Sequence, residues 1–185
     1  MKSIGQLRES QPNSTHSMEC TSLAFFDIET TGLRPDRGAR ITEIAIYNRN
    51  KDQFLWKHEK DQTSDKTLTE QLPIIFDLLT NGVVVGHNVG FDFYFLAYEA
   101  ERLGLRGPNV LFIDTLRLAK KLDKDTDDFK LSSLLRTFDI SVKGPLHTAA
   151  VDALATRALF WKLINLGEIE TLAQAGMQRL NWSTF

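Results

Sequence analysis

The sequence predicts an α/β domain built on a mixed five-stranded sheet with helices packed on its faces. Three apolar, strand-like segments come first, helices and strands then alternate, and helices complete the chain. Strands joined by short turns favour an antiparallel meander, whereas strands separated by a helix favour parallel pairing through a crossover connection. The 185 residues, of which 42% are hydrophobic, suit a single globular core.

The first three strands are predicted over 23–29, 40–47 and 53–57. The first is a nearly continuous apolar run, which is typical of a buried strand, and the second alternates between apolar and polar residues. Turn-forming residues at 35–36 and 48–52 separate the three segments. This part of the chain is therefore expected to form a meander at one edge of the sheet.

Helices and strands alternate in the middle of the chain. A helix is expected over 69–80, because residues 67–70 have the form of a capping box and Asn81-Gly82 provides a stop. The β-branched run 83–86 has the composition of a central strand. The later elements are expected to be a helix over 91–103, a strand over 110–113, helices over 115–122 and 131–138, and a long helix over 148–166.

These elements divide the chain into three parts. Residues 1–20 are polar and are expected to form a flexible leader, and residues 21–166 form the folded domain. Residues 167–185 are expected to be a C-terminal extension that adds one more helix and either packs on the domain or trails it.

Charge and cysteine content narrow the class of protein. Twenty-two Lys and Arg residues oppose 24 Asp and Glu residues, so the formal net charge is −2, which argues against binding nucleic acid by bulk charge alone. Cys20 is the only cysteine, so no intrachain disulfide forms and a reducing compartment is the simplest context. No segment resembles a secretory signal or reaches the roughly 20 apolar residues of a membrane span. We therefore expect a cytoplasmic protein with no membrane partner.

Two acidic residues lie on the first predicted strand. Asp27 and Glu29 are two residues apart, so their side chains point to the same face of the sheet. Their neighbours are apolar, and like charges inside a sheet are costly unless something compensates them. Hard divalent cations such as Mg²⁺ do so through oxygen ligands. From this segment alone, a metal site and a solvated strand end without a role both remain open.

Further polar residues follow the predicted strand 83–86. Asp92 stands where a helix begins, and an ordinary N-cap explains an isolated Asp there as well as a role in a site does. His87 and Asn88 lie at the carboxyl end of the strand, where α/β sheets tend to bind ligands. A structural histidine with its own hydrogen-bond partners explains His87 equally well.

His147 and Asp152 form the third group. Five residues apart on one regular helix, they would point in directions about 140° apart. The conflict disappears if Pro145 and His147 belong to the loop before the helix and Asp152 to its early turns. A loop histidine beside acids is a candidate general base because its pKa lies near neutrality, although alone it is explained as a surface residue.

The combination is more specific than any one part. It places four carboxylates and a histidine on three separate elements. Such a set fits phosphodiester hydrolysis with two metal ions about 3.5–4 Å apart, which activate a water and stabilise the leaving oxygen. The five candidate catalytic residues are Asp27, Glu29, Asp92, His147 and Asp152.

At these residues the sequence resembles the DEDDh-type, or DnaQ-like, family of 3′–5′ exonucleases, which includes the proofreading epsilon subunit of DNA polymerase III. The Asp-x-Glu motif with its Thr-Thr-Gly-Leu turn occupies 26–33, and His-Asn-x-x-Phe-Asp occupies 87–92. The motif of His with Asp five positions later occupies 147–152. The resemblance covers about 22–166 and implies a ribonuclease H-like fold.

The resemblance also implies an activity and roles for the five candidates. The activity is the release of nucleoside 5′-monophosphates from a 3′ end. It requires two divalent metal ions, which are Mg²⁺ ions that Mn²⁺ can replace. Asp27 would bridge the ions, and Glu29 and Asp152 would help hold the ion that activates the attacking water. Asp92 would support the other ion through water, and His147 would deprotonate the attacking water.

Substrate residues follow from the same motifs. Thr30 and Leu33 would hold the terminal nucleotide, and His87, Asn88 and Phe91 would line the site. The segment that often approaches the terminal nucleotide in the family, with an Ile-His-Gly-Ile-Thr-like sequence, is missing between the first two motifs. The nucleic acid therefore stays open at this point: DNA is favoured, and RNA is the alternative, as in ribonuclease T or oligoribonuclease.

Two further expectations concern partners. A catalytically silent nucleic-acid-binding domain on the same fold is the alternative to an enzyme, and a DNA polymerase is a candidate partner. The lysines at 120, 121 and 124 form a basic cluster, but the acids at 123, 125, 127 and 128 interrupt it. A solvated face is the expected role of this cluster.

Overall fold

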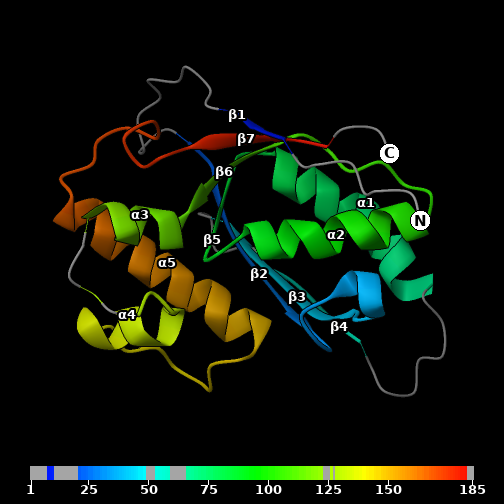
Figure 1. Cartoon of the computed structure of the whole chain (residues 1–185), viewed down its shortest axis with the longest axis horizontal. Coiled ribbons are helices and arrows are strands. Elements are labelled where there is room, and N and C mark those ends of the chain that lie inside the picture. Colours follow the sequence, from blue (N-terminus) through cyan, green and yellow to red (C-terminus); the bar gives the residue numbers. More distant parts are fainter. Residues whose placement is uncertain are drawn as a thin grey trace.

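The computed structural model describes residues 8–10, 21–48, 53–58, 66–122, 126 and 128–182. A single mixed sheet runs through the molecule in the strand order β1-β7-β6-β5-β2-β3-β4, with helices on both sides (Figure 1). The strands are β1 (Arg8–Ser10), β2 (Leu23–Thr30), β3 (Ile41–Asn48), β4 (Gln53–Lys57), β5 (Val83–Gly86), β6 (Val110–Asp114) and β7 (Gln178–Asn181). The helices are α1 (Lys66–Thr80), α2 (Gly90–Arg102), α3 (Thr115–Leu122), α4 (Leu131–Thr137) and α5 (Ala149–Leu166), with a short 3₁₀ turn, η2 (Pro35–Arg37).

The predicted α/β class and the meander at one sheet edge are confirmed. Strands β2, β3 and β4 pair antiparallel in sequence order, and β2, β5 and β6 pair parallel through crossover helices. The β2–β5 pairing is short, because Leu23, Ala24 and Phe25 face Val83, Val84 and Val85 and the pairing then stops. Beyond Phe25, no described strand pairs with β2 on its β5 side, so its backbone N–H groups there need other acceptors.

The two faces of the sheet are covered by different helices. Helices α1 and α2 pack on one face and α3, α4 and α5 on the other (Figure 1). Alternate residues of β2 divide accordingly, since Leu23 and Phe25 pack toward α5 whereas Ala24, Phe26 and Ile28 pack toward α1 and α2. Asp27 and Glu29 continue the Leu23–Phe25 face by the two-residue period of a strand. The acids therefore lie on the α5 side.

The strand count and the C-terminal element were predicted wrongly. The sheet formed by the described residues has seven strands rather than five, because β7 and β1 extend the edge beyond β6. Residues 178–181 form strand β7 rather than a helix, with Leu180 buried opposite Val110. β7 in turn pairs with β1 from the predicted leader, whose other residues lie outside the described part of the chain. Among the described residues, no helix is both long and apolar enough to cross a membrane.

Candidate active site

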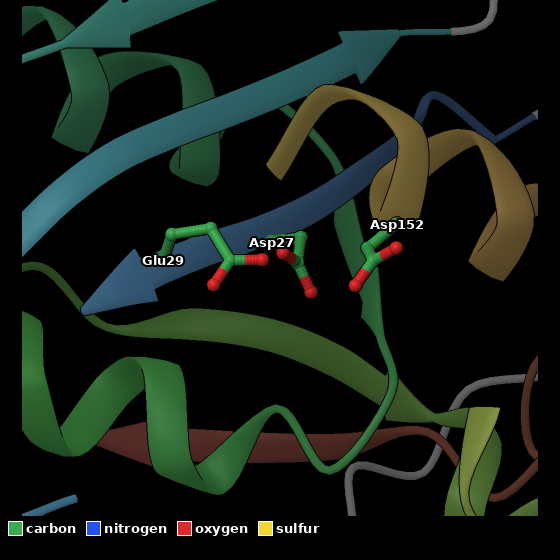
Figure 2. Close-up of side chains that lie close together, drawn as sticks. All are labelled: Asp27, Glu29 and Asp152. Carbon is green, nitrogen blue, oxygen red and sulfur yellow. The ribbon is translucent and has the colours of Figure 1, made fainter. Parts of the chain in front are cut away.

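Three carboxylates from two elements converge beside the sheet. Asp27 and Glu29 come from β2, and Asp152 comes from the first turn of α5. One oxygen of each lies within 4.8 Å of the others (Figure 2). The two-residue spacing on β2 thus places both strand acids on one face, as predicted, and helix α5 brings the third acid to the same face.

Burial and mutual repulsion make the ionised form of Asp27 costly. Desolvation is the largest cause, and the charges of Asp92, Asp152, Glu29 and Glu43 add to it, so the pKa of Asp27 rises from 3.8 to about 10. Burial also raises the pKa of Glu29 and of Asp152. Without a compensating cation, the ionised form of each of these three acids is therefore disfavoured relative to its form in water.

Asp92 occupies the edge of β2 where the pairing with β5 has ended. Its Oδ1 accepts a hydrogen bond from the backbone N–H of Ile28 at 3.0 Å, at the point where β5 no longer pairs with β2. Asp92 is 4% exposed, and burial holds its pKa well above the ordinary value, although the Ile28 N–H opposes this shift. The helix N-cap is Val89 and not Asp92. The acid therefore points into the sheet toward the site instead of capping its own helix.

His147 occupies the loop before α5, as its spacing from Asp152 required. Its backbone has a φ of 69°, in the left-handed region that non-glycine residues rarely adopt. The backbone N–H of His147 donates to both carboxylate oxygens of Asp152, each at 3.3 Å. This contact fixes the backbone of the loop to the acid, while the His147 side chain remains exposed at the cleft.

The acids open into a cleft of about 540 Å³. Asp27, His147 and Asp152 line it together with residues from the end of β5, from α3 and from the start of α4. This volume lies within the range of small-molecule and cofactor sites. The other lining residues are His87, Asn88, Leu116, Lys120, Asp128, Phe129, Lys130, Leu131, Ser132 and Leu146.

His87 and Asn88 lie in the cleft wall, but His87 has protein partners at both ring nitrogens. Nδ1 lies 2.9 Å from the Thr115 hydroxyl, and Nε2 lies 2.9 Å from the carbonyl of Phe129. Because a carbonyl only accepts, Nε2 carries the proton and donates it. Burial lowers the pKa of His87, which keeps the ring neutral. Asn88 is exposed and turns the chain with a φ of 59°.

The turn after β2 presents the other predicted substrate residues. Leu33 is 79% exposed, whereas the hydroxyl of Thr30 donates to the carbonyl of Gly32 at 2.7 Å. Phe91 is partly buried and packs against Phe95 with ring centroids 4.9 Å apart. Phe91 is not among the residues that line the described cleft.

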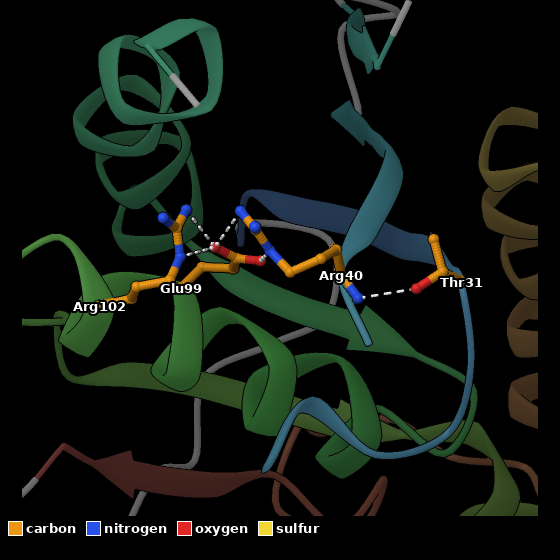
Figure 3. A network of polar contacts seen from close by, with 4 residues as sticks. All are labelled: Thr31, Arg40, Glu99 and Arg102. Atoms are coloured by element: carbon orange, nitrogen blue, oxygen red, sulfur yellow. Dashed lines mark hydrogen bonds and ion pairs between the residues drawn. The ribbon is translucent and has the colours of Figure 1, made fainter. Parts of the chain in front are cut away.

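An ion-pair cluster around the buried carboxylate of Glu99 holds this turn in place (Figure 3). The backbone N–H of Arg40 donates to the Thr31 hydroxyl at 2.9 Å, and Thr31 N–H donates back to the Arg40 carbonyl. The Arg40 guanidinium contacts Glu99 of α2 at 2.6 Å, and Arg102 contacts the same carboxylate at 2.9 Å. Glu99 is 3% exposed, so two cations compensate one buried acid and fix the turn to α2.

Two acids near the site were not foreseen as functional. Glu43 faces Glu29 across the β2–β3 pair, accepts the N–H of Ala149 at the start of α5, and contacts Lys57. Asp114 at the end of β6 accepts the N–H groups of Asn88 and Leu116, each at 2.9 Å. Glu43 thus supports the helix that carries Asp152, and Asp114 fixes the turn after β5. The alternation of β3 carried the signal for Glu43, because it places this residue on the face of Glu29.

The donor set fits hard divalent cations. All the converging ligands are carboxylate oxygens, which suit Mg²⁺ or Mn²⁺ and not softer metals. The raised pKa values of Asp27, Glu29 and Asp152 point the same way. Burial is the largest cause of each shift, repulsion adds to it at Asp27 and Glu29, and a bound cation would offset both. Asp92 lies outside the tight group of three, so any part it plays in metal binding is less direct.

Comparisons with known proteins agree with this fold. The family model described as the RNase_H superfamily matches residues 24–155. DNA polymerase III PolC-type from Caldanaerobacter subterraneus subsp. tengcongensis is 30% identical over 176 residues, covering 84% of this chain and 12% of that protein. The 3′-5′ exonuclease DinG of Bacillus subtilis is 26% identical over 159 residues, covering 75% of the chain and 17% of that protein. The chain thus spans less than a fifth of the length of either relative.

A solved structure shares the architecture. The nuclease domain of 3′hExo, described as a DEDDh family member bound to rAMP, superposes with a TM-score of 0.63 and 16% identity. The match covers 86% of this chain and 96% of that one. The ribonuclease H-like fold and the resemblance to DEDDh-type exonucleases, both expected from the motifs, are confirmed.

Proposed function

Because the chain belongs to the RNase_H superfamily, we propose that it is a metal-dependent 3′–5′ exonuclease that releases nucleoside 5′-monophosphates from single-stranded or frayed 3′ ends of DNA. The observation that carries the proposal is the convergence of Asp27, Glu29 and Asp152 within 4.8 Å, with Asp27 and Asp152 lining a cleft. A structural ion pair would not need three uncompensated acids in one place, and their mutual repulsion opposes folding. Such an arrangement is retained where it binds cations.

Each residue of the site has a role in this proposal. Asp27, Glu29 and Asp152 would hold two divalent ions, with Asp92 supporting from the unpaired edge of β2. When bound, the ions would supply activation of a water and stabilisation of the leaving oxygen. The imidazole ring of His147 accepts the proton of the attacking water. The hydrogen bonds from the His147 backbone N–H to Asp152 keep this residue beside the acids. Leu33 packs against the terminal nucleotide from its exposed turn.

DNA is the proposed polymer because the similar curated proteins are named for DNA polymerase III and for the exonuclease DinG. Association with a DNA polymerase is part of the proposal for the same reason, since the PolC-type relative contains the matching segment within a polymerase chain. RNA remains the competing substrate. The structural neighbour bound to rAMP bears only on the fold, at 16% identity.

The direct test compares matched DNA and RNA oligonucleotides labelled at the 5′ end. In Mg²⁺, the purified protein should shorten the DNA one nucleotide at a time from the 3′ end, visible as a ladder on a sequencing gel. Faster shortening of the RNA would assign the activity to RNA. Retention of bound oligonucleotide without any shortening, in Mg²⁺ or Mn²⁺, would favour the catalytically silent alternative.

Matched variants separate the site from the rest of the surface. Asp152→Asn removes one metal ligand and should abolish shortening. Asp77→Asn removes the same charge from the exposed face of α1 and should shorten DNA like the parent protein. Equal activity in both variants would contradict the metal mechanism.

A further inference from the structure

One wall of the cleft carries positive charge. Lys120, at the end of α3, and Lys130, directly before α4, both line the cleft that contains Asp27 and Asp152. Both lysines are exposed, and the ammonium of Lys120 lies 5.6 Å from the centroid of the Phe129 ring. The lysine cluster was expected to form only a solvated face, but the structure places Lys120 in the lining of the cleft.

The backbone of this wall is held from inside the protein. The carbonyl of Phe129, the residue before Lys130, accepts a hydrogen bond from the partly buried His87 ring. Asp128 accepts the N–H of Lys130 at 2.9 Å and the hydroxyl of Ser133 at 3.0 Å. Hydrogen bonds thus connect residues 128–130 to three parts of the fold. His87 follows β5, its other ring nitrogen lies beside the Thr115 hydroxyl at the start of α3, and Ser133 belongs to α4. Little order remains to be gained when a ligand binds there.

The charges of the wall are only partly compensated. Lys130 pairs with Asp128 at 3.6 Å, where both side chains are well exposed, so the pair is weak. In the described part of the chain, no carboxylate lies within ion-pair distance of the Lys120 ammonium, whose recorded contact is the Phe129 ring. The neighbouring Lys121 instead donates to the carbonyl of Gln174, away from the cleft. Two cations thus line the same cleft as Asp27 and Asp152.

We propose that Lys120 and Lys130 bind a backbone phosphate of the nucleic-acid strand on the upstream side of the bond that is cleaved. The inference rests on the proposed function and adds to it a requirement on the substrate, which needs at least one phosphate beyond the scissile one. The acidic end of the cleft takes the scissile phosphate with its metal ions, and the basic wall takes its neighbour. His87 acts as a positioning residue, through Phe129.

The test compares two substrates that differ in upstream phosphates. One is an oligothymidylate, and the other is the p-nitrophenyl ester of thymidine 5′-phosphate, which has a single phosphodiester. The ratio of kcat/KM for the oligonucleotide to kcat/KM for the ester should fall roughly tenfold in a Lys120→Met/Lys130→Met variant. Lys121→Met removes the same charge from the same helix and should leave the ratio unchanged. Lys120→Arg/Lys130→Arg keeps the charge and should keep the ratio.

A binding measurement keeps the inference separate from the proposed function. Fluorescence anisotropy of labelled oligothymidylate in Ca²⁺ reports affinity without turnover. The slope of log affinity against log salt should decrease by about 0.7 for each lost phosphate contact. If the parent protein cleaves neither substrate, the proposed function fails, but a reduced slope in the Met variant still supports the phosphate site. An unchanged slope, or an equal effect in Lys121→Met, would overturn it.

Discussion

Replacing Asp27 by Asn should stabilise the metal-free protein while abolishing its activity. The carboxyl of Asp27 lies among Asp92, Asp152, Glu29 and Glu43, and its pKa is raised to about 10. The unfolded chain ionises Asp27 near pH 3.8. At pH 8 the metal-free fold must therefore either protonate this group or tolerate its charge. An amide of the same shape avoids both costs and can donate to the neighbouring carboxylates.

The size of the effect follows from the pKa difference. Each pH unit above 3.8 costs about 1.4 kcal/mol while the folded state keeps its proton, which sets an upper limit of about 6 kcal/mol at pH 8. Asp27 retains partial contact with solvent in the cleft, so we expect about 2 kcal/mol. For a chain of this length, that corresponds to a rise in Tm of about 4–8 °C.

The pH dependence identifies the cause. Because the folded-state pKa lies above the unfolded value, the contribution of Asp27 to stability is fully present below about pH 4 and is lost as the pH rises toward 10. The difference in Tm between Asp27→Asn and the parent protein should therefore be small near pH 4 and grow with pH. Thermal unfolding followed by circular dichroism in EDTA measures it.

Two controls accompany this measurement. Asp77→Asn removes an exposed acid on α1 and should change Tm little at any pH. Saturating Mn²⁺ should raise the Tm of the parent protein, because a cation stabilises only the folded state that binds it. The Tm of the parent should then approach or exceed that of Asp27→Asn. A Tm gap that is absent at pH 8, or that is the same at all pH values, would refute the reasoning.

Three other variants give expectations of different kinds. His147→Ala should lower kcat by about 10²–10⁴-fold while the Mn²⁺-induced rise in Tm persists; loss of that rise would assign His147 to metal binding. Glu43→Ala removes the acceptor for Ala149 N–H and should lower unfolding free energy by about 1 kcal/mol in urea titrations; a change confined to activity would exclude this supporting role. Glu99→Leu leaves two guanidiniums without their shared carboxylate and should raise KM for DNA by loosening the Thr31 turn; an unchanged KM would show that the turn holds without the cluster.

Local patterns were sufficient for most elements of the domain. Strand β2 was predictable because its apolar run contains two acids at a spacing that puts them on one face, and the structure places them there. Helix α5 was predictable to within a residue, and His147 falls in the loop before it because the left-handed turn there interrupts the helix. Spacing therefore predicted the shared face of Asp27 and Glu29 and the loop position of His147, while the catalytic roles of these residues stay predictions.

Long-range pairing was not predictable in the same way. β7 has only one buried apolar residue, Leu180, and becomes a strand because β6 and β1 offer it hydrogen-bond partners. The hydrogen bonds of His87 were equally hidden, since Thr115 and Phe129 lie 28 and 42 residues further along the chain. The roles of Thr30, Leu33, Asn88 and Phe91 in substrate binding stay predictions.

The hydrogen bond between Asp92 and Ile28 has a consequence for how mutational data on this protein are interpreted. Asp92→Ala removes a negative charge and also leaves a buried N–H of the central strand without its acceptor. A dead Asp92→Ala enzyme would thus combine a chemical defect with a folding defect. Asp92→Asn keeps an oxygen for Ile28 and removes only the charge. The difference between these two variants, and not the alanine variant by itself, measures what Asp92 contributes to the chemistry.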